Sequence, residues 1–356
     1  MDELALDMIR AEIETADDCS QLRRLRDRLH HVFQTRLLVS DALEWNRVLN
    51  QVHDCFLRKS VALAQQNLRQ RGHEDAPASF AFVLFGSGGR GEQTLWSDQD
   101  NGLIYDDPAD SADRERADTY FTALSGEISS LLLELGYPPC AGEVICTNRR
   151  WRQPLSAFRD AMLAWFADPH WENVRYLLIF ADIRTVYGNS GLVRRLQQSF
   201  SARISRKPVI LEHMLHNTLH HKITLGIFGQ LIKERYGADA GGFDIKYGAY
   251  IPIVNGIRLL AVEAGIESTS TEQRIIELRQ RGRLEEEIAQ DWWEALSIAV
   301  KLRSLVPYQL EAGQYTSRGK LPADDLTKER TTQLKLCLRI GNDLQKFVKK
   351  RIRGEM

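Results

Sequence analysis

Hydrophobic positions divide the chain into helical ends and a mixed centre. In residues 1–72, apolar side chains such as Leu22, Leu25 and Leu29 recur every three or four residues. This spacing places them on one face of a helix. Residues 1–72 are therefore expected to be helical almost throughout, with Gly72 as a stop. We interpret this segment as a packing bundle.

The centre of the chain, up to about residue 190, predicts short strands mixed with helices. A continuous apolar run at 79–85 is short enough for a buried strand. Two more strands are expected at 99–105 and 142–147. Helical spacing returns in three segments, at 114–135, 155–167 and 171–178, and the last of these leads into the apolar residues 179–181.

After the turn at 188–191 the pattern is again helical. The apolar positions predict helices at 211–233, 253–264, 272–280, 291–305 and 331–350, with breaks at 237–242 and 313–322. The expected fold class is α+β. The expected domains are a helical segment at 1–74, a mixed unit at 75–190 and a helical unit at 191–356.

Composition excludes several classes of protein. The 47 Lys and Arg residues nearly balance 48 Asp and Glu residues, so the formal net charge of −1 provides no field for sequence-specific nucleic acid or for a membrane surface. The apolar runs are far shorter than the ~20 residues of a membrane helix, and the acidic start is unlike a signal peptide. Five scattered cysteines form no C-x-x-C pair, which favours a reducing cytoplasm.

One segment, residues 85–101, carries a pattern typical of phosphate binding. Gly86 and Ser87 follow the strand predicted at 79–85 and open a short helix rich in glycine. Backbone N–H groups at such a helix start lack partners, and glycine allows a phosphate to approach them closely. The Ser87 hydroxyl and the forked guanidinium of Arg90 would add donors.

Two aspartates follow at the start of the next predicted strand. Side chains alternate along a strand, so Asp98 and Asp100 are expected on one face and Gln99 on the other. Two carboxylates at such a short separation repel each other unless a cation neutralises their charge. Oxygen ligands beside a phosphate cradle suit Mg²⁺ or Mn²⁺, which is the arrangement for displacement at phosphorus.

Each of these features alone is common, but their combination is specific. No G-x-x-x-x-G-K-[ST] sequence occurs, which excludes a Walker A loop. The Rossmann fingerprint also fails, because the helix after the glycines is too short before the next strand begins.

The combined pattern resembles the DNA-polymerase-β-type nucleotidyltransferase signature of Gly-Ser followed by Asp-x-Asp. More narrowly, Gly-Ser-Gly-Gly-Arg-Gly-Glu-Gln with Ser-Asp-Gln-Asp-Asn is similar to the nucleotidyltransferases related to PII uridylyltransferase and glutamine-synthetase adenylyltransferase. The likeness continues through residues 127–148, 179–188, 226–231 and 244–258, so it covers about residues 75–350.

The resemblance implies a polymerase-β-like catalytic domain followed by a helical substrate-binding domain. Gly86 and Ser87 would then hold the phosphates of a nucleoside triphosphate, with Arg90 beside them, and Asp98 and Asp100 would bind Mg²⁺ or Mn²⁺. The expected reaction moves a nucleoside monophosphate to an acceptor hydroxyl on a protein and releases pyrophosphate.

The family fold also supplies a third carboxylate from a later strand. Asp182, after the apolar residues 179–181, is the preferred candidate, as a metal ligand or as the base for the acceptor hydroxyl. Glu143 is the alternative. In the second domain, Lys246 is expected either to reach the triphosphate or to be an ordinary solvated lysine.

Departures from the relatives leave alternatives open. The chain has no room for the phosphohydrolase domain and ligand-binding modules of PII uridylyltransferases, and its first 72 residues are too few for paired CBS domains. A nucleotide-binding regulator without catalysis is the second hypothesis, and an antitoxin or a small-molecule transferase is the third. Four histidines lie close together on one predicted helix: His213, His216, His220 and His221. The first three could share a face and form a zinc site, although a polar helix face is the simpler interpretation.

Overall fold

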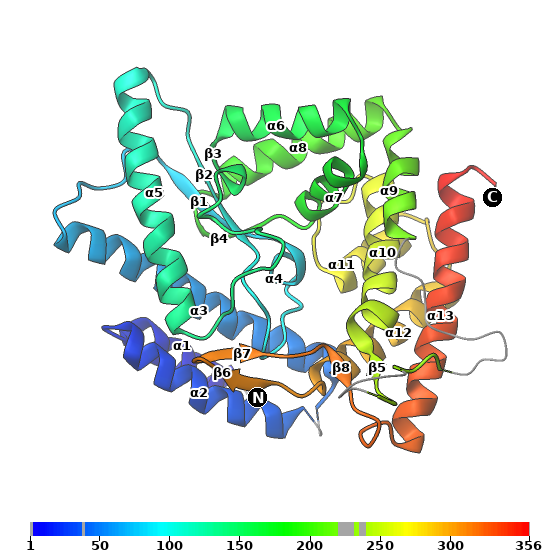
Figure 1. The fold of residues 1–356 in the computed structure, drawn as a ribbon. Helices are drawn as coiled ribbons and strands as arrows, with labels where there is room; N and C mark the ends of the chain where they lie inside the picture. Colours follow the sequence, from blue (N-terminus) through cyan, green and yellow to red (C-terminus); the bar gives the residue numbers. More distant parts are fainter. Residues whose placement is uncertain (1–2, 38–39, 220–230, 235–239, 356) are drawn as a thin grey trace.

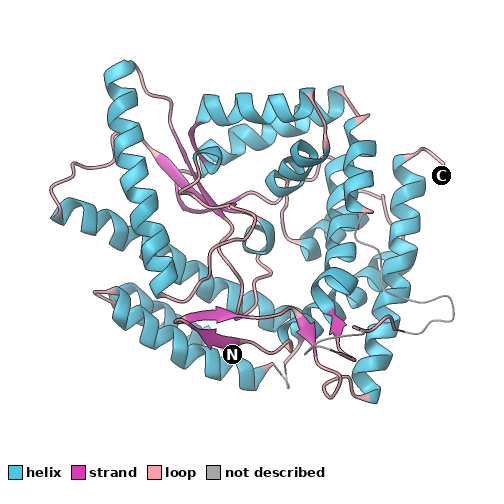
Figure 2. Ribbon diagram, in the orientation of Figure 1, coloured by secondary structure: helices cyan, strands magenta, loops and turns pink. Residues whose placement is uncertain are grey.

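The computed structural model describes residues 3–37, 40–219, 231–234 and 240–355. A small four-stranded sheet with its covering helices forms one side of the molecule, and a group of long helices that includes the C-terminal helix forms the other (Figure 1). Most of the chain is helical, as the colouring by secondary structure makes clear (Figure 2). The α+β class expected from the sequence is confirmed.

The N-terminal segment is helical, as predicted. Its helices are α1 (Glu3–Thr15), α2 (Cys19–Arg36) and α3 (Ala42–Gln70). Asp18 and Asp41 cap α2 and α3, because their carboxylates accept backbone N–H groups of the first turn. Gly72, with φ of +85°, stands just beyond the end of α3, where the left-handed conformation suits glycine.

The central sheet is mixed, with the strand order β3-β2-β1-β4. Its strands are β1 (Phe80–Leu84), β2 (Asn101–Tyr105), β3 (Arg152–Pro154) and β4 (Arg184–Gly188). β1 is antiparallel to both β2 and β4, and β2 is parallel to β3. Every residue of β1 and β2 is buried, which confirms the strand predicted from the apolar run at 79–85.

Alternate residues of β1 face different parts of the core. Phe80 and Phe82 join an apolar cluster with residues of α3 and of α5 (Ser111–Glu134). Ala81 and Val83 join a second cluster with residues of α6 (Leu155–Ala167) and α8 (Ser190–Arg206). Both faces of the sheet are therefore covered, which explains why the strand reads as a continuous apolar run.

The strand predicted at 142–147 is wrong. These residues form turns, in which Glu143 has φ of +56°. Two of their backbone polar groups bond to the distant Asn101, whose N–H donates to the Val144 carbonyl at 2.9 Å and whose side chain accepts from the Cys146 N–H at 2.8 Å. Residues 179–181 are not a strand either, since α7 (Trp171–Phe180) continues into them.

The second half of the chain is mainly helical, as expected. The helices are α9 (Ile210–Thr218), α10 (Ile251–Glu263), α11 (Thr271–Gln280), α12 (Glu286–Ser304) and α13 (Lys328–Ile352). One turn of π-helix, η2 (Lys246–Tyr250), leads into α10. The single helix predicted at 211–233 is wrong in its extent, because α9 ends at Thr218 and the described residues 231–234 are not helical.

Two small β-sheets in this half were not predicted. They pair β5 (Phe243–Asp244) with β8 (Lys320–Leu321), and β6 (Gln309–Glu311) with β7 (Gln314–Thr316). Strands of two or three residues are too short to show an alternating pattern in the sequence.

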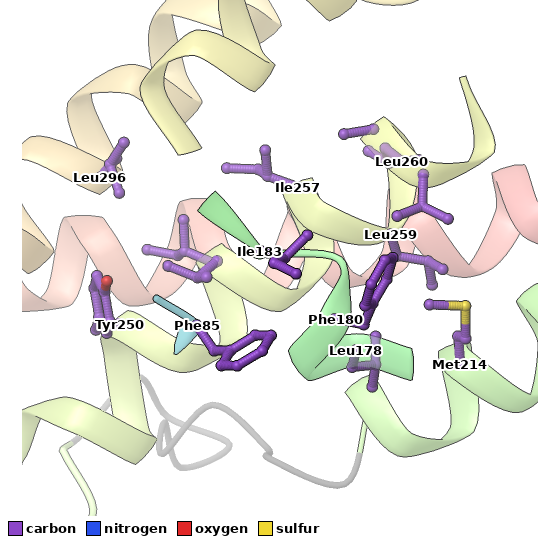
Figure 3. Packing of buried hydrophobic residues seen from close by; sticks show 14 of the residues in the cluster. Phe85, Leu178, Phe180, Ile183, Met214, Tyr250, Ile257, Leu259, Leu260 and Leu296 are labelled. Atoms are coloured by element: carbon purple, nitrogen blue, oxygen red, sulfur yellow. The ribbon is translucent and has the colours of Figure 1, made fainter. Parts of the chain in front are cut away.

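One apolar cluster is shared by both halves. Phe85, Phe180 and Ile183 from the sheet side belong to the same cluster as Ile257 and Met214 from the helical side, and Figure 3 labels all five among the side chains of this cluster. The two halves are therefore packed through a common core. No helix in the ranges that the structure describes has the length and apolar character that crossing a membrane demands.

We expect Gly89→Ala to destabilise the protein by about 2–4 kcal/mol. A Cβ at this position would lie 1.9 Å from the backbone oxygen of Asp182, so the two segments would have to separate. Gly126→Ala, in α5, is the control: its Cβ meets nothing within 4 Å, and alanine is the better helix former. Urea unfolding of both variants measures the difference, and equal stabilities would contradict the prediction.

Candidate active site

The site is built on the bend where β1 enters the short helix α4 (Gly86–Arg90). Gly86 has φ of +52°, and a Cβ there would lie 2.5 Å from Oδ2 of Asp100. Both facts require glycine, the first for the backbone conformation and the second for space. The carboxylate of Asp100 therefore packs directly against the bend.

The aspartate segment is held beside the bend by backbone hydrogen bonds. The N–H of Phe85 donates to the Asp100 carbonyl at 2.9 Å, and the N–H of Gln99 donates to the Pro138 carbonyl at 2.9 Å. Gln99 is 3% exposed, whereas Asp98 and Asp100 remain partly exposed. The two carboxylates thus differ from Gln99 in burial, in agreement with the predicted alternation, although the segment lies just before β2 begins.

The surroundings of Asp100 favour neutralisation of its charge. Burial, together with the neighbouring carboxylate of Asp98, raises the pKa of Asp100 to about 7. The Cys140 thiol, the Lys246 ammonium and the Arg90 guanidinium act in the opposite direction on this pKa. Two adjacent carboxylates, one of them partly desolvated, fit a hard divalent cation such as Mg²⁺ or Mn²⁺.

Ser87 and Lys246 lie near the same aspartates, and the Lys246 ammonium lies 5.4 Å from the ring centroid of Tyr247. Within the described ranges, the Ser87 hydroxyl makes no hydrogen bond to protein, and no carboxylate lies within ion-pair distance of the Lys246 ammonium. Lys246 stands at the start of η2, where its charge lowers the pKa of Asp100. The structure thus brings together the bend, Ser87, Lys246 and the two aspartates.

Asp182 has a different role from the one expected. It lies in the turn between α7 and β4, is 0% exposed, and accepts four hydrogen bonds. Arg258 donates to both of its oxygens at 3.0 and 2.6 Å, Arg274 donates to Oδ1 at 2.9 Å, and Arg90 donates to Oδ2. A carboxylate offers about four lone-pair sites. All are occupied by guanidinium groups, so Asp182 is neither a metal ligand nor a base here.

Arg90 also turns inward instead of toward a phosphate. It is 4% exposed, and its three nitrogens donate to Glu92, Asp182 and the Tyr250 hydroxyl. Glu92 is itself buried and accepts the Thr271 N–H at 2.9 Å. The expected phosphate contact from Arg90 is therefore corrected to a structural role, in which this side chain fixes the end of α4.

Two family models match the chain. Residues 8–172 match the model described as "Putative nucleotidyltransferase DUF294", and residues 208–352 match the one described as "Putative nucleotidyltransferase substrate binding domain". The chain belongs to this nucleotidyltransferase family. No curated protein matches it in sequence. The first match begins in α1, so the region that the family model covers includes the N-terminal helices.

In the part of the chain that the structure describes, Glu143, the alternative third carboxylate, makes no contact that places it beside Asp98 and Asp100. Glu143 is exposed in a turn, with φ of +56°. Across the described parts of the chain, no three His, Cys, Asp or Glu side chains form a group able to hold a metal ion. His213 and His216 are exposed on α9, and the other members of the histidine cluster, His220 and His221, lie outside the described residues.

Support of the Gly86 bend by α3 was not predicted from the sequence. Asp54 of α3 pairs with Arg184 at 2.7 and 2.9 Å, and Arg184 in turn donates to the Gly88 carbonyl at 2.8 Å. Asn50 of α3 accepts the Gln93 N–H at 2.8 Å and donates to the Gln93 carbonyl at 3.1 Å. Helical spacing in α3 predicts a buried face, but it does not identify these distant partners.

We expect Asp182→Asn to cost about 3–5 kcal/mol of stability, because it leaves buried guanidinium groups without a counter-charge. The arginines lower the pKa of Asp182 below its ordinary 3.8. Its ionised form therefore stabilises the fold above about pH 4, and this contribution is lost as the pH falls below that value. Urea unfolding at pH 7 measures the cost. Asp343→Asn, at a side chain that is 74% exposed, is the control and should change little.

Asp100→Asn should have the opposite effect on stability in the absence of divalent ions. Because the pKa of Asp100 is raised from 3.8 to about 7, its charge destabilises the fold above pH 7, and this penalty disappears as the pH falls toward 4. At pH 8 we expect the variant to melt about 2–4 °C above the wild type. Thermal melts from pH 4 to 8 in EDTA test this, and a gain that is constant with pH would contradict it.

Proposed function

We propose that the protein is a Mg²⁺-dependent nucleotidyltransferase that moves a nucleoside monophosphate from a nucleoside triphosphate to an acceptor hydroxyl. The observation that carries the proposal is the contact of the Asp100 carboxylate with the Gly86 bend, with Asp98 and Lys246 beside it. Family membership supports the reaction class. Mn²⁺ would replace Mg²⁺ at the same carboxylates.

In this proposal the chain's own residues divide the work. The backbone at Gly86 and the Ser87 hydroxyl would bind phosphate oxygens, and the Lys246 ammonium would neutralise part of the triphosphate charge. Asp98 and Asp100 would hold the divalent ion, which supplies charge neutralisation at the phosphates and polarises the α-phosphorus. The partly exposed position of both aspartates leaves them accessible to a ligand.

The chemistry is a displacement at the α-phosphorus. The acceptor oxygen forms a bond to phosphorus, the bond to the β-phosphate oxygen breaks, pyrophosphate leaves, and the hydroxyl proton passes to solvent. We propose a hydroxyl on a protein as the acceptor and ATP or UTP as the donor, by the resemblance to adenylyl- and uridylyltransferases. The match of residues 208–352 to a substrate-binding domain supports a separate surface for the acceptor.

A second candidate function is a nucleotide-binding regulator without catalysis. The observation that favours it is that arginines bind both oxygens of Asp182. The reaction expected from the family resemblance uses three carboxylates, and two, Asp98 and Asp100, lie at the bend. This candidate keeps phosphate binding at the bend and requires no pyrophosphate release.

The deciding experiment combines each of the four labelled nucleoside triphosphates with the protein, Mg²⁺ or Mn²⁺, and a lysate of the source cell. We expect metal-dependent pyrophosphate release and label on one protein band. Asp98→Asn and Asp100→Asn should each lower turnover about 100-fold or more, because each removes a metal-binding carboxylate. Asp75→Asn, at a side chain that is 83% exposed, is the control and should retain wild-type turnover.

Nucleotide binding is measured in parallel by equilibrium dialysis. Turnover lost in Asp100→Asn with nucleotide still bound supports the enzyme. Nucleotide bound by the wild type without pyrophosphate release, for every nucleotide and metal, supports the regulator. A wild-type protein that binds none of the four nucleotides would contradict both functions.

A further inference from the structure

Arg26 of α2 is a buried cation without an acidic partner. It is 1% exposed, and it takes part in no ion pair among the described residues. Its guanidinium donates to the Leu135 carbonyl at 2.6 Å and to the Leu95 carbonyl at 3.4 Å, and it stacks 3.5 Å from the ring centroid of Tyr137. Burial lowers the pKa of Arg26. A buried charge without a counter-charge is costly, so these contacts need an explanation.

The two carbonyl groups that Arg26 binds belong to two segments near the aspartates. Leu95 is three residues before Asp98, and Leu135 directly precedes the turn 136–139. The carbonyls of this turn receive both N–H donors of Gln99: the side-chain amide donates to Tyr137 at 3.0 Å, and the backbone N–H donates to Pro138 at 2.9 Å.

Gln99 connects this turn to the site, because it is the residue between Asp98 and Asp100. A strand-like bridge also joins Gln99 to Pro139. Side chains alternate along an extended segment. Anchoring the Gln99 side chain on one face therefore fixes the orientation of Asp98 and Asp100 on the opposite face. A continuous path of contacts therefore runs from Arg26 through the turn 136–139 to the two carboxylates.

Other elements hold the same turn. His53 of α3 lies 2.6 Å from the Tyr137 hydroxyl, and burial lowers the pKa of His53 to about 3, so its ring is neutral at pH 7. From the β6–β7 hairpin, the Tyr315 N–H donates to the Gly136 carbonyl at 3.1 Å, and the Arg26 guanidinium lies 4.9 Å from the centroid of the Tyr315 ring. Segments from both ends of the chain thus converge on the turn.

We propose that Arg26 is a positioning residue for the divalent-ion site: it holds the turn 136–139 and, through Gln99, sets the relative orientation of Asp98 and Asp100. This inference rests on the proposed role of the two aspartates as metal ligands. It assigns to the N-terminal helices a part in the active site beyond packing.

The test measures Mn²⁺ affinity of the full chain without nucleotide, by electron paramagnetic resonance of the free ion. We expect Arg26→Met and Gln99→Ala each to weaken Mn²⁺ binding about tenfold. Because the two substitutions act through the same path of contacts, the double variant should bind Mn²⁺ no more weakly than the single variant with the lower Mn²⁺ affinity. Arg26→Lys, which keeps the charge and one donor, should recover part of the loss. Arg24→Met, at an exposed arginine on the same helix, is the control.

Thermal melts by circular dichroism establish that each variant is folded at the assay temperature. Wild-type Mn²⁺ affinity in folded Arg26→Met would overturn the inference, and so would additive losses in the double variant. If Arg26→Met does not fold, Gln99→Ala decides the question, because unchanged affinity there breaks the proposed path. A wild-type protein that binds no Mn²⁺ overturns the proposed function itself, which separates that failure from the failure of the inference.

Discussion

The fold depends on one buried carboxylate, that of Asp182, which binds three guanidinium groups at once. Arg90 comes from α4, Arg258 from α10 and Arg274 from α11, so this single side chain ties the bend at Gly86–Arg90 to two helices of the second half. Glu92 supplies a second negative charge to the same network. Because Arg258 and Arg274 would be buried charges without a counter-charge if Asp182 were removed, loss of this carboxylate would destabilise the contacts of both helices.

This network explains why Asp182, which was expected to bind a metal ion or act as a base, instead forms ion pairs with arginines. A metal ligand needs a free lone pair, and the four sites of Asp182 are filled by donors. The same constraint applies to Arg90, whose nitrogens are all used within the protein. The groups proposed for ligand binding are Ser87, Lys246 and the aspartate pair. Asp182 and Arg90 thus support the bend from within the protein, whereas Ser87, Lys246 and the aspartate pair are the groups proposed to contact a ligand.

The N-terminal helices are an integral part of the nucleotidyltransferase region. Asp54 pairs with Arg184, which contacts α4, and Asn50 binds Gln93 just after α4. Arg26 binds the Leu135 carbonyl, directly before the turn 136–139. The family match starting at residue 8 agrees with these contacts. Apolar packing alone would stabilise the helices, but these polar contacts fix where residues 86–100 lie, because hydrogen bonds are directional whereas hydrophobic contacts are not.

The sequence alone determined what depends on near neighbours: the periodic helices, the buried strand before Gly86, and the spacing that places two aspartates beside the bend. Local spacing sufficed there because strand and helix periods act over a few residues. Only the tertiary structure decided the roles of Asp182 and Arg90, which are 92 residues apart, and the support from Arg26, 109 residues from Leu135. A carboxylate reads the same in sequence whether it meets a metal ion or three arginines, since its partners come from distant segments that only the packed fold brings together.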